Sequence, residues 1–180
     1  MGEAITERDS LPVMTTLGVT TLISDSGVTR YRVNTEEWMM YDRKKPSYWA
    51  FEKGVYMEQF DSIFNVEASI KADTAYYYDK ERLWKLIGNV DIQNRKGERF
   101  NTELLYWNEA TQKVYSDKFI RIQQPDRIIT GHGFDSNQQM TIYTIRNIEG
   151  IFYVDEEASS GPPQPETKAL PDSVNKDTAK

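Results

Sequence analysis

The chain contains no cysteine and only one histidine among its 180 residues. Disulfide bridges, thiolate metal sites and a thiol nucleophile are therefore excluded. No run of about eighteen apolar residues occurs, so the sequence predicts no membrane-spanning helix. The opening residues, MGEAITERDS, also lack the apolar segment of a secretory signal.

A basic excess is missing as well. The formal net charge is −6, of which residues 1–14 carry −2 and residues 155–180 carry −3. The long middle part, residues 15–154, is therefore nearly neutral. A protein that binds nucleic acid needs a basic surface to neutralise phosphates. The charge distribution thus argues against a nucleic-acid partner.

Composition divides the chain into three parts. We interpret residues 1–14 as a lead-in segment, residues 15–154 as one folded domain, and residues 155–180 as a disordered, acidic, proline-rich tail. The tail has few apolar side chains, so it cannot bury enough surface to offset the entropy lost on ordering.

The middle part has the pattern of β-strands. Aromatic residues make up 12% of the chain, and eleven of them are tyrosines, which favour a pleated sheet. Apolar and polar residues alternate in VTRYRV (28–33), LIGNVDI (86–92) and TIYTIRNI (141–148), as in half-buried strands. Clusters of turn-forming residues separate such runs. They are DSG (25–27), NRKG (94–97), WNEATQ (107–112), QPD (124–126) and DSNQ (135–138).

A 29-residue repeat underlies this pattern. Residues 72–79, 101–108 and 130–137 occupy equivalent positions, and a second alternating segment follows each of them. Residues 34–42 form a weaker copy; they have helical propensity, but their place in the repeat predicts a strand. Each copy supplies two strands, so the sequence predicts an all-β fold, an antiparallel β-jellyroll or rolled half-pipe sheet. Its first and last strands would be open edges that can pair with another copy of the same repeat.

Several short elements follow one another at characteristic spacings between residues 50 and 152. They are Ala72-Asp73, Gly88-Asn89-Val90, Gly97, Thr102-x-x-Leu105-x-Trp107-Asn108, Ser116-Asp117, Gly131-x-Gly133-Phe134 and Tyr143-x-Ile145-x-x-Ile148-x-Gly150. In this order they make the chain resemble the LptC family of lipopolysaccharide-export proteins. More broadly, the chain resembles the OstA-like β-jellyroll modules of the same machinery.

The resemblance implies a periplasmic domain, tethered to the inner membrane by an N-terminal anchor that this chain lacks. Such a domain receives lipopolysaccharide from an inner-membrane ABC transporter at one sheet edge. It passes the lipid to a soluble periplasmic bridge module at the other edge, for which the resemblance favours residues 140–154. The family offers no role for residues 155–180.

No catalytic centre is evident in the sequence. His132 has no neighbouring cluster of acids or histidines, so we expect it to be a turn histidine and expect no metal, no cofactor and no enzymatic activity. Gly88, Gly131 and Gly133 are expected to relieve steric crowding where strands bend or bulge. The acidic pairs at 36–37 and 156–157 are expected to be solvated surface. The basic clusters at 43–45, 80–82 and 95–99 are expected in turns, where some could meet lipid phosphates.

The apolar face of the repeat is the candidate binding surface. If the half-pipe encloses an open trough, the side chains that face inward would contact the acyl chains of lipopolysaccharide. In the register of the repeat these are Val90, Ile92, Leu105, Trp107, Ile120, Ile122, Phe134, Tyr143 and Ile145. Two alternatives stay open: a glycan-binding domain with aromatic stacking platforms, and a purely structural adaptor with a dry core.

Overall fold

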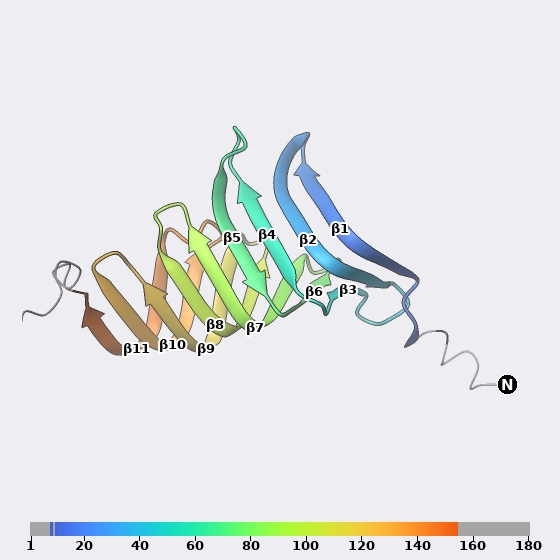
Figure 1. Cartoon of the computed structure of the whole chain (residues 1–180). Helices are drawn as coiled ribbons and strands as arrows, with labels where there is room; N and C mark the ends of the chain where they lie inside the picture. The colour runs from blue at the N-terminus through green and yellow to red at the C-terminus, as the bar shows by residue number, and fades with distance from the viewer. Residues whose placement is uncertain (1–7, 9, 155–180) are drawn as a thin grey trace, which may run out of the picture.

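The structure is a computed structural model that describes residue 8 and residues 10–154. The predicted tail, 155–180, and most of the lead-in lie outside the described residues. The described part forms eleven strands in a single antiparallel sheet (Figure 1). The strands are β1 (Met14–Asp25), β2 (Val28–Tyr41), β3 (Tyr48–Phe51), β4 (Val55–Phe60), β5 (Val66–Ala72), β6 (Thr74–Tyr78), β7 (Leu83–Asn94), β8 (Arg99–Asn108), β9 (Lys113–Gln123), β10 (Arg127–Asn137) and β11 (Tyr143–Tyr153). The predicted all-β fold is confirmed.

The short strands β3 to β6 are the halves of two interrupted long strands. Strands β3 and β4 both pair with β2, and the three residues between them form a turn. Strands β5 and β6 both pair with β7 and are separated by Asp73 alone. The sheet is therefore a series of long antiparallel strands, with β1 at one end and β11 at the other (Figure 1).

Each long strand bends near its middle, and the bends line up in a crease. The register shifts between Ile87 and Val90 on β7, and between Thr102 and Tyr106 on β8. Hydroxyl groups bind backbone carbonyls beside the crease: Thr102 donates to the oxygen of Phe119 at 2.8 Å, and Ser116 to that of Leu104 at 2.6 Å. These bonds satisfy polar backbone groups that a continuous ladder would otherwise pair.

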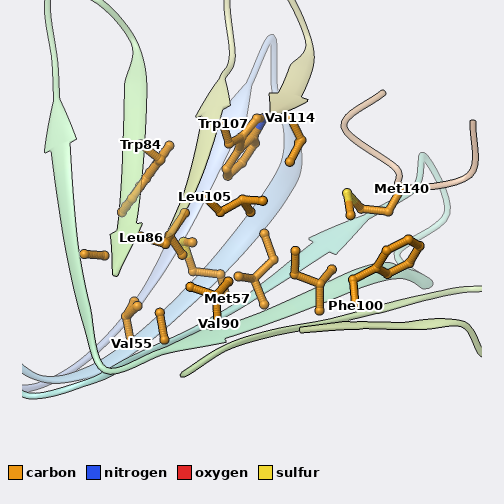
Figure 2. Packing of buried hydrophobic residues seen from close by; sticks show 14 of the residues in the cluster. Val55, Met57, Trp84, Leu86, Val90, Phe100, Leu105, Trp107, Val114 and Met140 are labelled. Carbon is orange, nitrogen blue, oxygen red and sulfur yellow. The ribbon is translucent and has the colours of Figure 1, made fainter. Parts of the chain in front are cut away.

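The crease divides the sheet into two facing walls. The first wall contains β4, β5 and the parts of the long strands that pair with them in series, including residues 90–94 and 99–102. The second wall contains β3, β6 and the other halves, including residues 83–87 and 104–108. Alternate side chains of both walls point inward, as the two-residue period requires. They form the hydrophobic core (Figure 2).

The sequence predictions of strands hold, but two predicted turns are shifted. The turn predicted at 107–112 begins two residues later, since β8 continues to Asn108. Residues 36–41 are strand, despite their helical propensity, because they pair with β1 on one side and β3 on the other. The turn predicted at 135–138 is wrong by three residues, since β10 stays paired with β9 up to Asn137. The chain reverses instead at residues 138–142. In the part of the chain that the structure describes, no helix is long and apolar enough to cross a membrane.

Candidate functional site

The space between the two walls is open at the β1 end of the sheet. A cavity of about 340 Å³ lies there, between residues of β1 and β2 on the first wall and the inner side of the second wall. Its lining is mainly aromatic and aliphatic. The main contributors are Ile23 and Val33 on the first wall, and Trp38, Trp49, Phe51, Tyr77 and Trp84 on the second.

The aromatic side of the cavity is built by cross-strand pairing. Trp49 of β3 is opposite Tyr77 of β6, and Tyr77 is opposite Trp84 of β7. Their ring centroids lie 5.0 and 4.7 Å apart, and Trp38 of β2 lies 5.0 Å from Trp49. Aromatic neighbours at these separations stabilise one another beyond the area that they bury. The four strands thus hold a rigid apolar wall against the cavity.

Glu109 places one carboxylate at the end of this aromatic wall. It accepts hydrogen bonds from Trp84 Nε1 at 2.9 Å and from the Tyr77 hydroxyl at 3.3 Å, and Arg82 Nε lies 3.5 Å away. Burial, reinforced by the charge of Glu109, raises the pKa of Tyr77 to about 12. Among the described residues, the buried indole N–H groups of Trp38 and Trp107 have no hydrogen-bond partner. Of these two residues, Trp38 lines the apolar cavity.

A polar hollow of about 440 Å³ adjoins the apolar cavity at the mouth between the walls. The two share Ile23, Ser24, Tyr77 and Glu109 in their linings. The polar hollow adds Arg30 from the first wall, and Arg82 and several glutamines from the second. The hollow also contains Glu67 and Glu109, and Arg82 is paired with Glu109, so its charges are mixed. An apolar space beside such a polar mouth suits an amphiphile with a polar head.

Toward β11 the mouth is bridged by a set of hydrogen bonds that we call the seam. Asn94, Lys96, Glu98 and Gln124 belong to the first wall, and residues 138–143 to the second. The Asn94 side chain donates to the oxygen of Met140 at 2.8 Å, and Lys96 Nζ to that of Thr141 at 3.2 Å. Glu98 accepts from the Tyr143 hydroxyl at 2.5 Å and from Gln124 at 3.0 Å.

The protonation states of Glu98 and Tyr143 at neutral pH favour the hydrogen bond between them. Burial alone would raise the pKa of Glu98, but the hydrogen bonds from Tyr143, Asn94 and Gln124, with nearby Lys96, outweigh burial and lower it. Burial, followed by the hydrogen bond to Glu98, raises the pKa of Tyr143 to about 12. The carboxylate is therefore charged and the phenol neutral, as this donor–acceptor pair requires.

The nine predicted inner-face residues lie on the inner side and belong to one apolar cluster. Seven are buried, and Tyr143 and Ile145 are half-buried and pack against the same cluster. Leu105 lies opposite Leu86, and Trp107 lies opposite both Trp84 and Val114. Side chains of the two walls meet here, as in the contact of Phe100 with Phe134 at 5.7 Å. Contact of these nine residues with acyl chains stays a prediction.

The three predicted structural glycines lie at irregular points of the strands. Gly88 and Gly133 have φ values of +79° and +78°, and each lies where the register shifts. A side chain is disfavoured in that conformation. Gly131 is different, because a Cβ atom there would lie 2.3 Å from the backbone oxygen of Asn147. Its hydrogen lets β11 approach β10 closely.

The sequence patterns missed the two features that define the open and closed parts of the trough. The aromatic wall of Trp38, Trp49 and Tyr77 was missed because only Tyr77 lies in a clear copy of the repeat, although the concentration of aromatic residues in 48–51 and 74–78 could have indicated it. The seam could not be read from sequence, since Asn94 and Met140 are 46 positions apart. Nothing in the local pattern links a turn after β7 with one after β10.

His132 lies within β10 and not at a turn, so that prediction was wrong. Its Nδ1 atom lies 2.5 Å from Glu149 Oε1, and its ring packs edge-on against Phe119 at 5.5 Å. It borders an open hollow of about 800 Å³ on the outer face of the sheet, lined by mixed charges such as Lys71, Asp91 and Arg121. Within the described ranges, no group of three or more His, Asp or Glu side chains is placed to hold a metal ion.

The model of the family described as "Lipopolysaccharide-assembly, LptC-related" matches residues 13–152. This range contains the open cavity, the seam and nearly the whole sheet. No curated protein matches the chain.

Proposed function

Because this chain belongs to the LptC-related family of lipopolysaccharide-assembly proteins, we propose that it is a periplasmic carrier of lipopolysaccharide. A role in lipopolysaccharide transport comes with the family. The finer proposal is that the trough takes the acyl chains while the sugars stay outside at its mouth. In this reading the protein acts by binding alone, without catalysis and without a metal or other cofactor.

The observation that carries the proposal is the aromatic-lined cavity between the walls at the β1 end. Its volume of about 340 Å³ lies in the range of roughly 300–1,000 Å³ that is common for small-molecule sites. Each methylene moved from water into such a space contributes about 0.8 kcal/mol. At the adjoining mouth Arg30 could meet a phosphate of a lipid head group, and Arg82 could do so by exchanging its ion pair with Glu109.

The two open sheet edges support a place in a chain of related modules. Strand β1 ends the sheet on one side and carries the exposed side chains of Leu17 and Leu22. Strand β11 ends the other side and exposes Ile148, Phe152 and Tyr153. We propose that the inner-membrane ABC transporter pairs at one edge and that a soluble bridge module extends the sheet at β11, through main-chain hydrogen bonds. We also propose that an anchor to the inner membrane holds the domain beside the transporter.

A photo-crosslinking side chain tests the location of the lipid. Placed at Trp49 in the cavity, or at Trp107 among the predicted inner-face residues, it should capture lipopolysaccharide upon irradiation. The matched control is Arg121, which lies at the hollow of the outer face. Equal capture from both faces, or capture from neither inner position in a folded protein, would refute the trough as the binding site.

One observation favours the structural adaptor as a second candidate. Val90, Leu105 and Ile120 are fully buried against other side chains, so the half of the trough toward β11 is closed in this structure. An adaptor with a dry core would need no lipid at all. It would still pair at both edges, but would give no crosslink to lipopolysaccharide from Trp49.

A further inference from the structure

The trough is open near β1 and closed near β11, and the seam is what closes its mouth. We propose that the loop between β10 and β11, residues 138–142, is a latch that must release before acyl chains can move from the open cavity toward β11. This inference rests on the proposed carrier function and adds a controlled step within the same trough.

The latch is a preformed loop with an apolar plug. Asn137 Oδ1 accepts hydrogen bonds from the backbone N–H groups of Thr141 at 2.9 Å and Ile142 at 3.1 Å, which fix the shape of the loop. Met140 has a φ of +56°, an unfavourable value for a residue with a side chain. Its side chain is 1% exposed and enters the same apolar cluster as Phe100 (Figure 2). The loop lies at the mouth of the trough, and the side chain of Met140 alone extends from it into the hydrophobic core.

The residues that hold the latch belong to the opposite wall, at the turn between β7 and β8. Asn94 is the central residue, because its side chain donates to the Met140 oxygen and to Glu98, while its Oδ1 accepts from Lys96 N and Glu98 N. Glu98 continues the seam to Tyr143. Both Asn94 and Glu98 are buried. The bond from Asn94 to Met140 is therefore shielded from water, which strengthens it, whereas the bond from Lys96 to Thr141 is exposed.

The seam can break without disrupting the sheet. Its bonds across the mouth all involve side chains, while the strand ladders run through the crease below. The walls could therefore part about the crease while every ladder hydrogen bond is kept. Parting would expose Phe100, Leu105 and Ile122, which costs free energy in water. Acyl chains that enter behind the latch would cover the same surfaces and offset that cost.

The β1 end is arranged differently from the seam. Tyr31 of the first wall packs edge-on against Trp107 of the second wall at 4.9 Å, but the apolar cavity and the polar mouth, which share Tyr77 and Glu109, leave open space between the walls. The asymmetry gives the trough a direction: a lipid can enter near β1 while the exit toward β11 is still latched. The latch loop leads directly into β11, the strand that is proposed to pair with the bridge module. Pairing at β11 and release of the latch would therefore influence each other.

A covalent lock across the mouth tests this proposal. The chain has no cysteine of its own, so Lys96→Cys with Thr141→Cys gives a single thiol pair, which a short bis-methanethiosulfonate reagent joins through two reducible disulfides with release of two sulfinates. The control pair, Asp91→Cys with Arg99→Cys, replaces two side chains that form an ion pair on the outer face and does not span the mouth. Photo-crosslinkers at Trp49 and at Ile145 report arrival of detergent-dispersed lipopolysaccharide at the two ends of the trough.

In the locked protein, capture at Trp49 should persist and capture at Ile145 should be lost, and a cleavable link should restore capture when it is reduced. The control pair should leave both signals unchanged. Equal capture at Ile145 in locked and unlocked protein would refute the latch while leaving the carrier function intact. No capture at either position in the unlocked protein would refute the carrier function and the latch with it.

A second variant weakens the seam instead of locking it. Tyr143→Phe keeps the aromatic ring, which packs at 5.1 Å from Phe100, but removes the hydroxyl that Glu98 accepts from. Capture at Ile145 should increase relative to the unmodified protein, while capture at Trp49 stays the same. Unchanged capture at Ile145 in this folded variant would contradict the role of the seam.

Discussion

Leu105→Ala measures how firmly the closed half of the trough is packed. Leu105 is fully buried on the second wall, and its cross-strand neighbour Leu86 is fully buried as well. Both residues lie on strands that are hydrogen-bonded to a neighbouring strand on each side. The backbone can therefore move only slightly to fill the space left by a truncated side chain. Truncations of this kind cost about 2.7–5 kcal/mol, rising with the volume of the cavity left behind. We expect the upper part of that range, about 3–5 kcal/mol.

This loss would be a large share of the stability of a small domain, which is typically about 5–15 kcal/mol. For a chain of this size each kcal/mol shifts Tm by about 2–4 °C, so the variant should melt roughly 6–20 °C lower. Urea unfolding followed by the fluorescence of the four tryptophans gives the free energy directly. The midpoint should fall while the slope with urea stays constant, since the surface exposed on unfolding hardly changes.

Ile142→Ala is the matched control, because that side chain is 75% exposed. A surface truncation should change stability by no more than about 0.5 kcal/mol. A loss below about 1 kcal/mol for Leu105→Ala would refute the reasoning, because it would mean that Leu105 faces an open groove and makes few contacts. In that case the half of the trough toward β11 would already be open, and the seam would not control the entry of acyl chains.

Three further predictions follow from individual contacts. Gly131→Ala should loosen β11, because the new Cβ would lie 2.3 Å from the backbone oxygen of Asn147; hydrogen exchange should speed up in β11 and not in β7. Ile148→Lys should leave stability within about 0.5 kcal/mol, because the side chain is 56% exposed, but should weaken co-purification with a bridge module that pairs at this edge. Unfolding at high pH should depend on Tyr143. Its folded pKa of about 12 exceeds the ordinary tyrosine pKa of 10.0, so its contribution to stability is present below pH 10 and is lost between pH 10 and about 12. Tyr143→Phe should flatten the decline of the urea midpoint over that range.

The strand pattern was readable from sequence because it depends on local chemistry. Alternation in residues 86–92 and 141–148 specifies which side chains face inward, and the turn at 94–97 specifies where a strand ends. The repeat then fixes the serial order of the strands, since each copy brings the next strand back alongside the last. For the same reason, the nine predicted inner-face residues do share one face.

What the local pattern could not determine is how far apart the two walls stand. Alternation says that Leu105 and Phe134 point inward, but not whether they meet side chains, lipid or water. That depends on contacts between residues far apart in sequence, such as Asn94 with Met140 and Phe100 with Phe134. The open cavity and the seam are both products of wall separation, which only the tertiary structure sets. The sequence by itself determined the two faces of the sheet, and the folded chain decided where the trough between them is open.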